Sequence, residues 1–214
     1  MGHAARSQRR LRRIRADEFA HVRKMFDAKL GLTVAKILPG EYYATDEDEC
    51  IVTTLGSCVS ACLWHPDSGI GGMNHFMLPD AGASGREAIG SATDAARYGS
   101  FAMEHLINAI LATGLRREDL CAKIVGGGHV LPIATDVGAR NIQFVRDYLA
   151  NEGIAIIGEN VGDLHGRQVR FRPATGNAQV RALGSSVQTS IAQEEDVYRR
   201  SLAQKPTEGE IELF

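Results

Sequence analysis

The sequence predicts an α+β fold with layers of strands and helices. Short runs of β-branched and apolar residues alternate with turn signals, and longer segments repeat apolar residues every three or four positions, as amphipathic helices do. Two further runs separated by a short turn are typical of a β-hairpin. Strands and helices do not alternate regularly, so we do not expect a doubly wound parallel sheet.

The first half of the chain is dominated by short apolar runs. Residues 26–38 contain few apolar positions and predict a connector, and residues 41–49 are acidic, so the body is expected to begin at Cys50. Residues 79–90 are rich in Gly, Ala and Ser and predict a surface loop. The β-branched and apolar runs predict strands at residues 51–55, 59–64 and 70–78.

The second half of the chain contains the clearest helix signal. Residues 93–113 place Tyr98, Phe101 and Ala102 on one apolar face, and Gly114 is expected to end the helix. Further helices are predicted at residues 139–151 and 190–202. Predicted strands lie at residues 121–125 and 154–157, and residues 168–172 and 179–183 predict a hairpin around the turn at residues 174–177.

The composition is that of a globular domain with a substantial core. The chain has 214 residues, of which 44% are apolar and 23% are charged, and its formal net charge is −2. These values exclude disordered, collagen-like and coiled-coil classes. No apolar run approaches the roughly 18–20 residues that span a bilayer, and the Arg-rich start lacks the apolar stretch of a secretory signal. We therefore expect a cytoplasmic protein without membrane insertion.

Basic residues are concentrated at the start of the chain. Residues 1–24 contain eight basic and two acidic groups, so the remainder carries a net negative charge. A basic arm on an acidic body is one way to bind nucleic acid or an anionic membrane surface. No aromatic residue lies among the arginines, as stacking on single strands would need. We favour a solvated, partly helical extension and expect no nucleic-acid partner.

The four cysteines, Cys50, Cys58, Cys62 and Cys121, are expected to be free thiols. They are too few for a disulfide scaffold, and the chain has no C-x-x-C pair of the kind that zinc sites use. We therefore expect no metal site. A free cysteine is most often a small buried hydrophobic residue, and Cys62 is expected to be one.

Cys58 is the best candidate nucleophile because it follows Gly56 and Ser57, which allow a tight bend between two predicted strands. Such a bend lets the thiol protrude while backbone N–H groups around Gly56 and Ser57 converge on a developing oxyanion. His75 lies one strand and one turn later and is the candidate base. Thr53 is positioned to accept a hydrogen bond from the other ring nitrogen.

The sequence alone also allows a purely structural role for Cys58 and His75. A Cys and a His on neighbouring strands are weak evidence for catalysis, and the alternative is a buried Cys58 beside a hydrogen-bonded core His75. His129 is a rival base, His105 is expected to be a core histidine, and His65 and His165 lie in polar turns. The triple glycine at residues 126–128 lacks the spacing of nucleotide-binding loops.

Several motifs closely resemble the bacterial chemoreceptor glutamine deamidase family CheD. The most specific are Thr54-Leu55-Gly56-Ser57-Cys58-Val59-Ser60 and Gly71-Gly72-Met73-Asn74-His75-Phe76-Met77-Leu78-Pro79. The resemblance extends over about residues 35–175, and residues 209–214 are similar to the family's ending. Further matching segments are Pro39-Gly40-Glu41-Tyr42-Tyr43, Ala96-Arg97-Tyr98-Gly99, Lys123-Ile124-Val125-Gly126-Gly127, Gly138-Ala139-Arg140-Asn141 and Thr175-Gly176.

The resemblance implies a layered α/β/β/α sandwich related to the deamidase domains of certain bacterial toxins. It also implies a Cys–His–Thr triad that hydrolyses the side-chain amides of particular glutamines in methyl-accepting chemotaxis receptors to glutamates, without a metal or cofactor. By position, Cys58 is the nucleophile and His75 the base. Thr53 and Thr54 both fit the position of the triad's threonine, and we prefer Thr53.

The resemblance further implies a cytoplasmic protein that acts on receptor helices. Some relatives bind a CheC-type phosphatase, and nothing in the sequence requires more than a monomer. We expect a basic extension over residues 1–34, a deamidase domain over residues 35–184, and a C-terminal helix with an acidic tail over residues 185–214. The loop at residues 80–92 is a candidate rim of the site, and Leu213-Phe214 a candidate docking segment.

Three features differ from the usual family pattern. The Arg-rich arm lies outside the common core, Gly162-Asp163 stands where two glycines are usual, and Gly128-His129-Val130 is unusual after two glycines. These differences concern partner binding and loop shape more than the triad.

Overall fold

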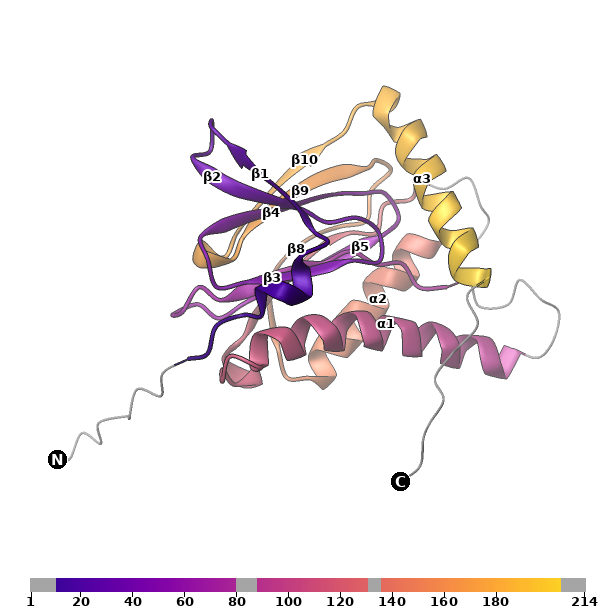
Figure 1. Cartoon of the computed structure of the whole chain (residues 1–214). Coiled ribbons are helices and arrows are strands. Elements are labelled where there is room, and N and C mark those ends of the chain that lie inside the picture. The colour runs from indigo at the N-terminus through magenta and orange to yellow at the C-terminus, as the bar shows by residue number, and fades with distance from the viewer. Residues whose placement is uncertain (1–10, 80–87, 131–135, 205–214) are drawn as a thin grey trace.

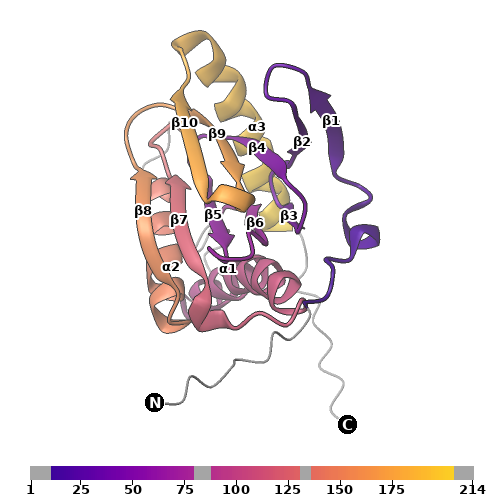
Figure 2. The same cartoon turned by 90° about the vertical axis from the view of Figure 1, so that its left-hand side faces the viewer.

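Two five-stranded sheets face each other in a computed structural model that describes residues 11–79, 88–130 and 136–204 (Figures 1 and 2). The first sheet has the order β1-β2-β4-β9-β10 and the second has the order β3-β6-β5-β7-β8. Neighbouring strands are antiparallel except for the parallel pairs β2–β4 and β7–β8. The strands are β1 (Arg23–Asp27), β2 (Leu32–Lys36), β3 (Tyr42–Thr45), β4 (Glu49–Leu55), β5 (Val59–Trp64), β6 (Gly71–Asn74), β7 (Cys121–Gly126), β8 (Ala155–Val161), β9 (Arg167–Arg172) and β10 (Asn177–Ala182).

In the described part of the chain, three α-helices complete the fold and confirm the α+β class. α1 (Ala88–Leu111) packs on β3 and β6, and α2 (Val137–Asn151) packs on β7 and β8, so both cover the outer face of the second sheet. α3 (Ser185–Gln204) lies across the ends of both sheets, at the right of Figure 1. Short 3-10 helices cover Ala16–Phe19, Arg117–Asp119 and Pro173–Thr175. The relation to toxin domains stays a prediction.

The core lies between the two sheets and under α1 and α2. β9 shows strict alternation, with Arg167, Val169 and Phe171 buried, because successive side chains of a strand point to opposite faces. β5 is buried at every position, since the first sheet covers one of its faces and the helices cover the other. Phe171 contacts Trp64 of β5 edge to face, with ring centroids 5.8 Å apart, and this contact joins the two sheets.

The predicted strands and helices from residue 50 onward are confirmed, with shifted ends. The strand expected at residues 70–78 is shorter, since β6 ends at Asn74. α1 begins at Ala88, inside the segment expected to be a loop, and residues 80–87 of that loop and rim lie outside the described residues. The tail at residues 205–214, including the candidate docking segment, also lies outside them.

The connector expected at residues 26–38 is wrong. β1 and β2 form an antiparallel hairpin at the edge of the first sheet, with Gly31 at a positive φ of 65° in its turn. β1 is an edge strand whose first four residues are exposed, so it lacks the apolar alternation that predicts a half-buried strand. β3 was missed as well, within the acidic run. Since β2 crosses residue 35, the predicted domain boundary at that position falls inside a strand, and the division into regions stays a prediction.

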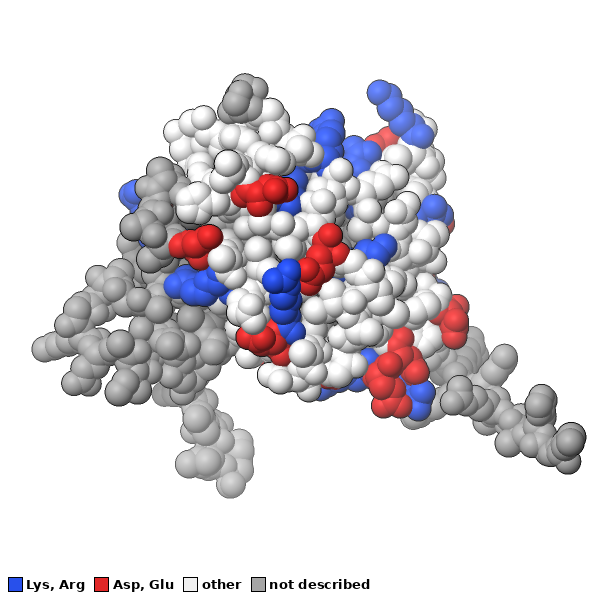
Figure 3. Space-filling view, turned by 180° about the vertical axis from the view of Figure 1, so that it is seen from behind, with Lys and Arg blue, Asp and Glu red and all other residues white. Residues whose placement is uncertain are grey.

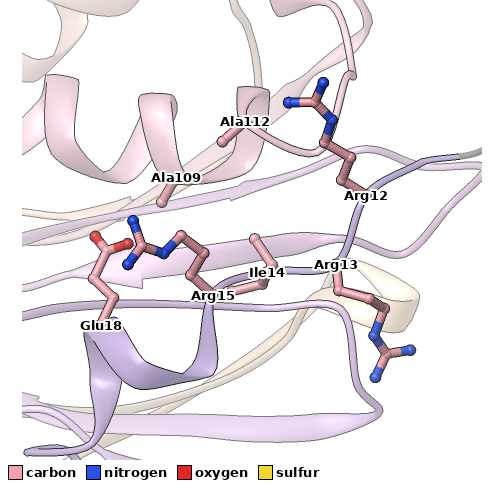
Figure 4. A pocket seen from close by; sticks show the side chains of 7 residues that line it. All are labelled: Arg12, Arg13, Ile14, Arg15, Glu18, Ala109 and Ala112. Atoms are coloured by element: carbon pink, nitrogen blue, oxygen red, sulfur yellow. The ribbon is translucent and has the colours of Figure 1, made fainter.

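Part of the basic arm lies against the body of the protein. The Arg12 N–H donates to the carbonyl of Thr113 at 2.8 Å, and Arg13 pairs with Asp46 and Glu47. A cavity of about 180 Å³ lies between the arm and the C-terminal half of α1, with Ala109 among its lining residues (Figure 4). Residues 11–15 therefore contact the body, although Leu11, Arg12, Arg13 and Arg15 are exposed, as a solvated extension would be.

Charged side chains of both signs are interspersed on the face seen in Figure 3. A nucleic-acid site usually shows a continuous basic surface, and the visible part of this face has none. Among the described residues, no helix combines the length and the apolar character needed to cross a bilayer.

Replacing Phe171 should destabilise the fold because its ring is fully buried between the sheets. We expect Phe171→Ala to lower the free energy of unfolding by about 3–5 kcal/mol, as measured by urea denaturation. Leu164→Ala is the control, since Leu164 is 75% exposed, and it should change the value by less than about 0.5 kcal/mol. Equal effects of the two substitutions would contradict the packing described above.

Candidate active site

Cys58 lies where the chain passes from β4 in one sheet to β5 in the other. Three hydrogen bonds hold the carbonyl groups of the bend. The N–H groups of Gly128 and Gly127 donate to the carbonyls of Gly56 and Cys58, each at 2.7 Å. The Asn141 side-chain amide of α2 donates to the carbonyl of Ser57 at 2.8 Å. The triple glycine therefore supports the bend, and the bend's own N–H groups remain available for another partner.

His75 directly follows β6 and turns its ring toward β4. Its Nδ1 lies 2.8 Å from the Thr53 hydroxyl, which itself donates to the carbonyl of Ile37 at 2.8 Å. Because the single hydroxyl hydrogen is used on Ile37, the Thr53 oxygen accepts from Nδ1–H. In the uncharged ring the other nitrogen, Nε2, is then unprotonated, and it has no hydrogen-bond partner among the described residues.

Thr53, and not Thr54, lies against His75. Thr53 is 2% exposed, while Thr54 is half-buried on the opposite face of β4, because successive side chains of a strand alternate. Strand register thus decides which of Thr53 and Thr54 contacts His75, a choice that the sequence left open.

A ring nitrogen of His75, the Sγ of Cys58 and a carboxylate oxygen of Glu195 lie within 4.8 Å of one another. All three side chains are buried. The expected pair of thiol and imidazole is therefore brought together, and a third group from α3 joins it.

Burial keeps both members of this pair neutral. It raises the pKa of the Cys58 thiol well above its usual range, and the nearby Glu195 carboxylate raises that pKa further. Burial also lowers the pKa of His75 to about 4, although the same carboxylate acts in the opposite direction. In this arrangement the sulfur is a thiol and the imidazole is uncharged at neutral pH.

Glu195 occupies the anion site that was expected for the reaction. One carboxylate oxygen, Oε1, accepts from the N–H groups of Gly56 and Cys58 at 2.8 and 3.1 Å. The other, Oε2, accepts from the N–H and the hydroxyl of Ser57 at 2.6 and 2.7 Å. Gly56 is required for this fit, since a Cβ there would lie 2.6 Å from Oε2.

Glu195 was not predicted from the sequence. The helix expected at residues 190–202 was identified, but its apolar stripe of Ile191, Tyr198 and Leu202 also includes Glu195, and this acid in an apolar stripe was a usable signal.

Cys58, His75 and Glu195 also offer the ligand atoms that metal ions bind. However, four donors already use the four lone-pair positions of the Glu195 carboxylate. Donors that converge in this way favour an anion and not a cation, so the arrangement fits acyl-transfer chemistry better than metal binding.

The remaining candidates lie elsewhere. His129 is exposed, its Nδ1 lies 3.7 Å from Oδ1 of Asp136, and the histidine that clusters with Cys58 is His75. Cys62 is fully buried, as expected. His105 is half-buried beside Tyr42 and Phe101, in partial agreement with its prediction as a core residue.

The lowered pKa of His75 should make the protein less stable in acid. Between its ordinary pKa near 6.5 and about 4, the unfolded chain binds a proton that the folded chain does not. The stabilisation is complete above pH 6.5 and is lost as the pH falls toward 4, by about 3 kcal/mol. We expect His75→Gln to flatten this part of the curve of unfolding free energy against pH. Identical curves for both proteins would contradict a buried, neutral His75.

Comparison with known proteins places these features in a family. Residues 77–182 match the model described as CheD chemotactic sensory transduction. A protein of Hydrogenovibrio crunogenus named "Probable chemoreceptor glutamine deamidase CheD" is 45% identical over 194 residues, which cover 90% of this chain and 100% of that protein. Proteins of the same name from Methylobacillus flagellatus and Herminiimonas arsenicoxydans are 47% and 48% identical over 191 residues, covering 88% of this chain and 93% of each relative. The chain belongs to the CheD family.

Proposed function

We propose that this protein is a glutamine deamidase that converts specific glutamines of methyl-accepting chemotaxis receptors to glutamates. Its relatives carry the name chemoreceptor glutamine deamidase, which denotes a protein-glutamine glutaminase. The observation that best supports this activity is the anion site of Gly56, Ser57 and Cys58 beside the Cys58 thiol and His75. It provides the groups that hydrolysis of an amide through a thioester requires.

In the proposed reaction, Nε2 of His75 takes the proton of Cys58, and the thiolate attacks the side-chain amide carbon of the glutamine. The tetrahedral oxyanion binds the N–H groups of Gly56 and Cys58, which already hold one oxygen of a carboxylate. Oxyanion donors of this kind are worth roughly 3–4 kcal/mol each where measured. Thr53 accepts from Nδ1–H and so keeps the ring in the tautomer that presents Nε2.

The second half of the reaction releases the products. Protonated His75 gives its proton to the departing nitrogen, so that ammonia leaves and a thioester remains on Cys58. His75 then deprotonates a water molecule, which hydrolyses the thioester to glutamate and returns the thiol. Each new glutamate becomes available for methylation, which is how we propose that the enzyme tunes chemotaxis signalling.

Partner binding is a separable part of the proposal. A protein that acts on the cytoplasmic helices of receptors works in the cytoplasm, and we propose that location. Since one chain contains all the groups named above, we also propose that the protein is a monomer. Binding of a CheC-type phosphatase would need a docking surface but no turnover, and it should survive loss of the Cys58 thiol.

Removing either reacting group should abolish the activity. We expect Cys58→Ala and His75→Ala to lower the rate of ammonia release from a purified receptor cytoplasmic fragment by more than about a thousandfold, because the two groups act as one unit. Circular dichroism should show a folded protein in both cases. Cys121→Ser removes a half-buried thiol from β7 and should keep the wild-type rate. Continued conversion of Gln to Glu by Cys58→Ala, detected by mass spectrometry, would exclude Cys58 as the nucleophile.

A further inference from the structure

α3 contacts the rest of the protein through one narrow stripe. Ile191, Glu195 and Leu202 are buried, and Tyr198 between them hydrogen-bonds through its hydroxyl to that of Tyr98 in α1. These positions follow one another at intervals of three or four residues, so they form one helix face. Away from this face, Val197 is exposed, and Val187 in the first turn of the helix is exposed as well. Helix α3 thus docks by its side chains and adds no strand to either sheet.

The centre of this stripe is an acid, although a buried carboxylate is costly unless it is fully hydrogen-bonded. Glu195 is 2% exposed, and its four donors all come from the bend at Gly56, Ser57 and Cys58. A helix that served only to cover the core would gain more from an apolar residue here. Binding to the anion site therefore explains why position 195 is an acid.

The chemistry of the occupant matches the product of the proposed reaction. Deamidation of a glutamine on a helix leaves a glutamate on a helix, and Glu195 is a glutamate that α3 presents to the anion site. A carboxamide would fit less well than a carboxylate, since its NH₂ group would face the N–H of Ser57, which needs an acceptor.

While α3 is docked, another protein has no access to the thiol. Cys58 has no exposed surface, and a Glu195 oxygen lies within 4.8 Å of its Sγ, on the N–H groups that the proposed reaction assigns to the substrate. Tyr198 closes the neighbouring space, with its hydroxyl 3.0 Å from the position of a Cβ on Gly40. A substrate helix can therefore react only after α3 has moved away.

We propose that α3 is an intramolecular occupant of the substrate-helix site, with Glu195 held as a built-in analogue of the product, so that the docked form of the enzyme is autoinhibited. The inference rests on the proposed function and adds its regulation and the form of its substrate, a helix that presents one side chain to the bend. A receptor helix displaces α3 by competing for the same donors.

Kinetics of the full-length chain test the competition. A tethered competitor raises the apparent KM for the receptor fragment and leaves kcat unchanged, because saturating substrate displaces it. We expect Glu195→Ala to lower the apparent KM about tenfold at unchanged kcat, since charged hydrogen bonds of the docked state are lost. Glu194→Ala is the matched control: Glu194 is exposed on the same helix and should leave both constants unchanged. An unchanged KM, or a lower kcat as expected of a residue that takes part in the chemistry, would overturn the inference.

A second variant tests whether residue 195 occupies the productive position. In Glu195→Gln, Cys58 should attack the new side-chain amide, release ammonia and, after hydrolysis by water, return a glutamate at position 195. We expect mass spectrometry to find Glu at this position in the single variant and Gln in the double variant Glu195→Gln/Cys58→Ala. In the control Glu194→Gln, the new glutamine should persist.

The two experiments separate this inference from the proposed function. If receptor glutamines are converted while the glutamine introduced by Glu195→Gln persists, the function stands and the inference is wrong. If that introduced glutamine is converted in a Cys58-dependent reaction while receptor glutamines are not, the deamidase chemistry and the placement of α3 stand, and the receptor is the wrong substrate.

Discussion

Three consecutive peptide groups, oriented at the point where the chain crosses between the sheets, determine the chemistry of this protein. The carbonyls of Gly56 and Cys58 accept from the glycine loop after β7, and that of Ser57 accepts from Asn141 of α2. With the carbonyls held on one side, the N–H groups converge on the other, beside the thiol. Because these bonds come from buried elements, the anion site is organised before a ligand arrives, which is the condition under which such donors are most effective.

The same burial that organises the site also controls the charge of its reacting groups. With α3 docked, the raised pKa of Cys58 and the lowered pKa of His75 keep both neutral. A thiolate is the form of cysteine that attacks substrates and is also the form that is oxidised. A covered, protonated Cys58 is therefore protected from side reactions, while the contact with Thr53 fixes the tautomer of the His75 ring.

The predictable parts of the fold are those in which the local pattern of apolar residues and turn signals agrees with the burial of the residues in the folded protein. β4 and β5 carry β-branched, buried residues, and β9 with β10 flanks a strong turn signal. β1 was not predictable, since an exposed edge strand leaves no apolar alternation. The spacing of Cys58 and His75 on neighbouring strands was weak evidence by itself, although the structure does bring the two side chains together, and choosing Thr53 required strand register. Glu195 contacts Gly56 across 139 positions of sequence, and an acid on an amphipathic helix is ordinarily solvated, so its role depends on tertiary structure.

The short link between β10 and α3 has a consequence for how the enzyme would respond in the cell. Leu183 and Gly184 keep the helix attached next to its docking site, so closure is a unimolecular event with a fixed effective concentration. Dilution or higher expression leaves the proportion of closed molecules unchanged. If α3 is the proposed occupant, what shifts the balance is the local concentration of competing receptor helices, so activity would rise steadily with the density of substrate helices around the enzyme.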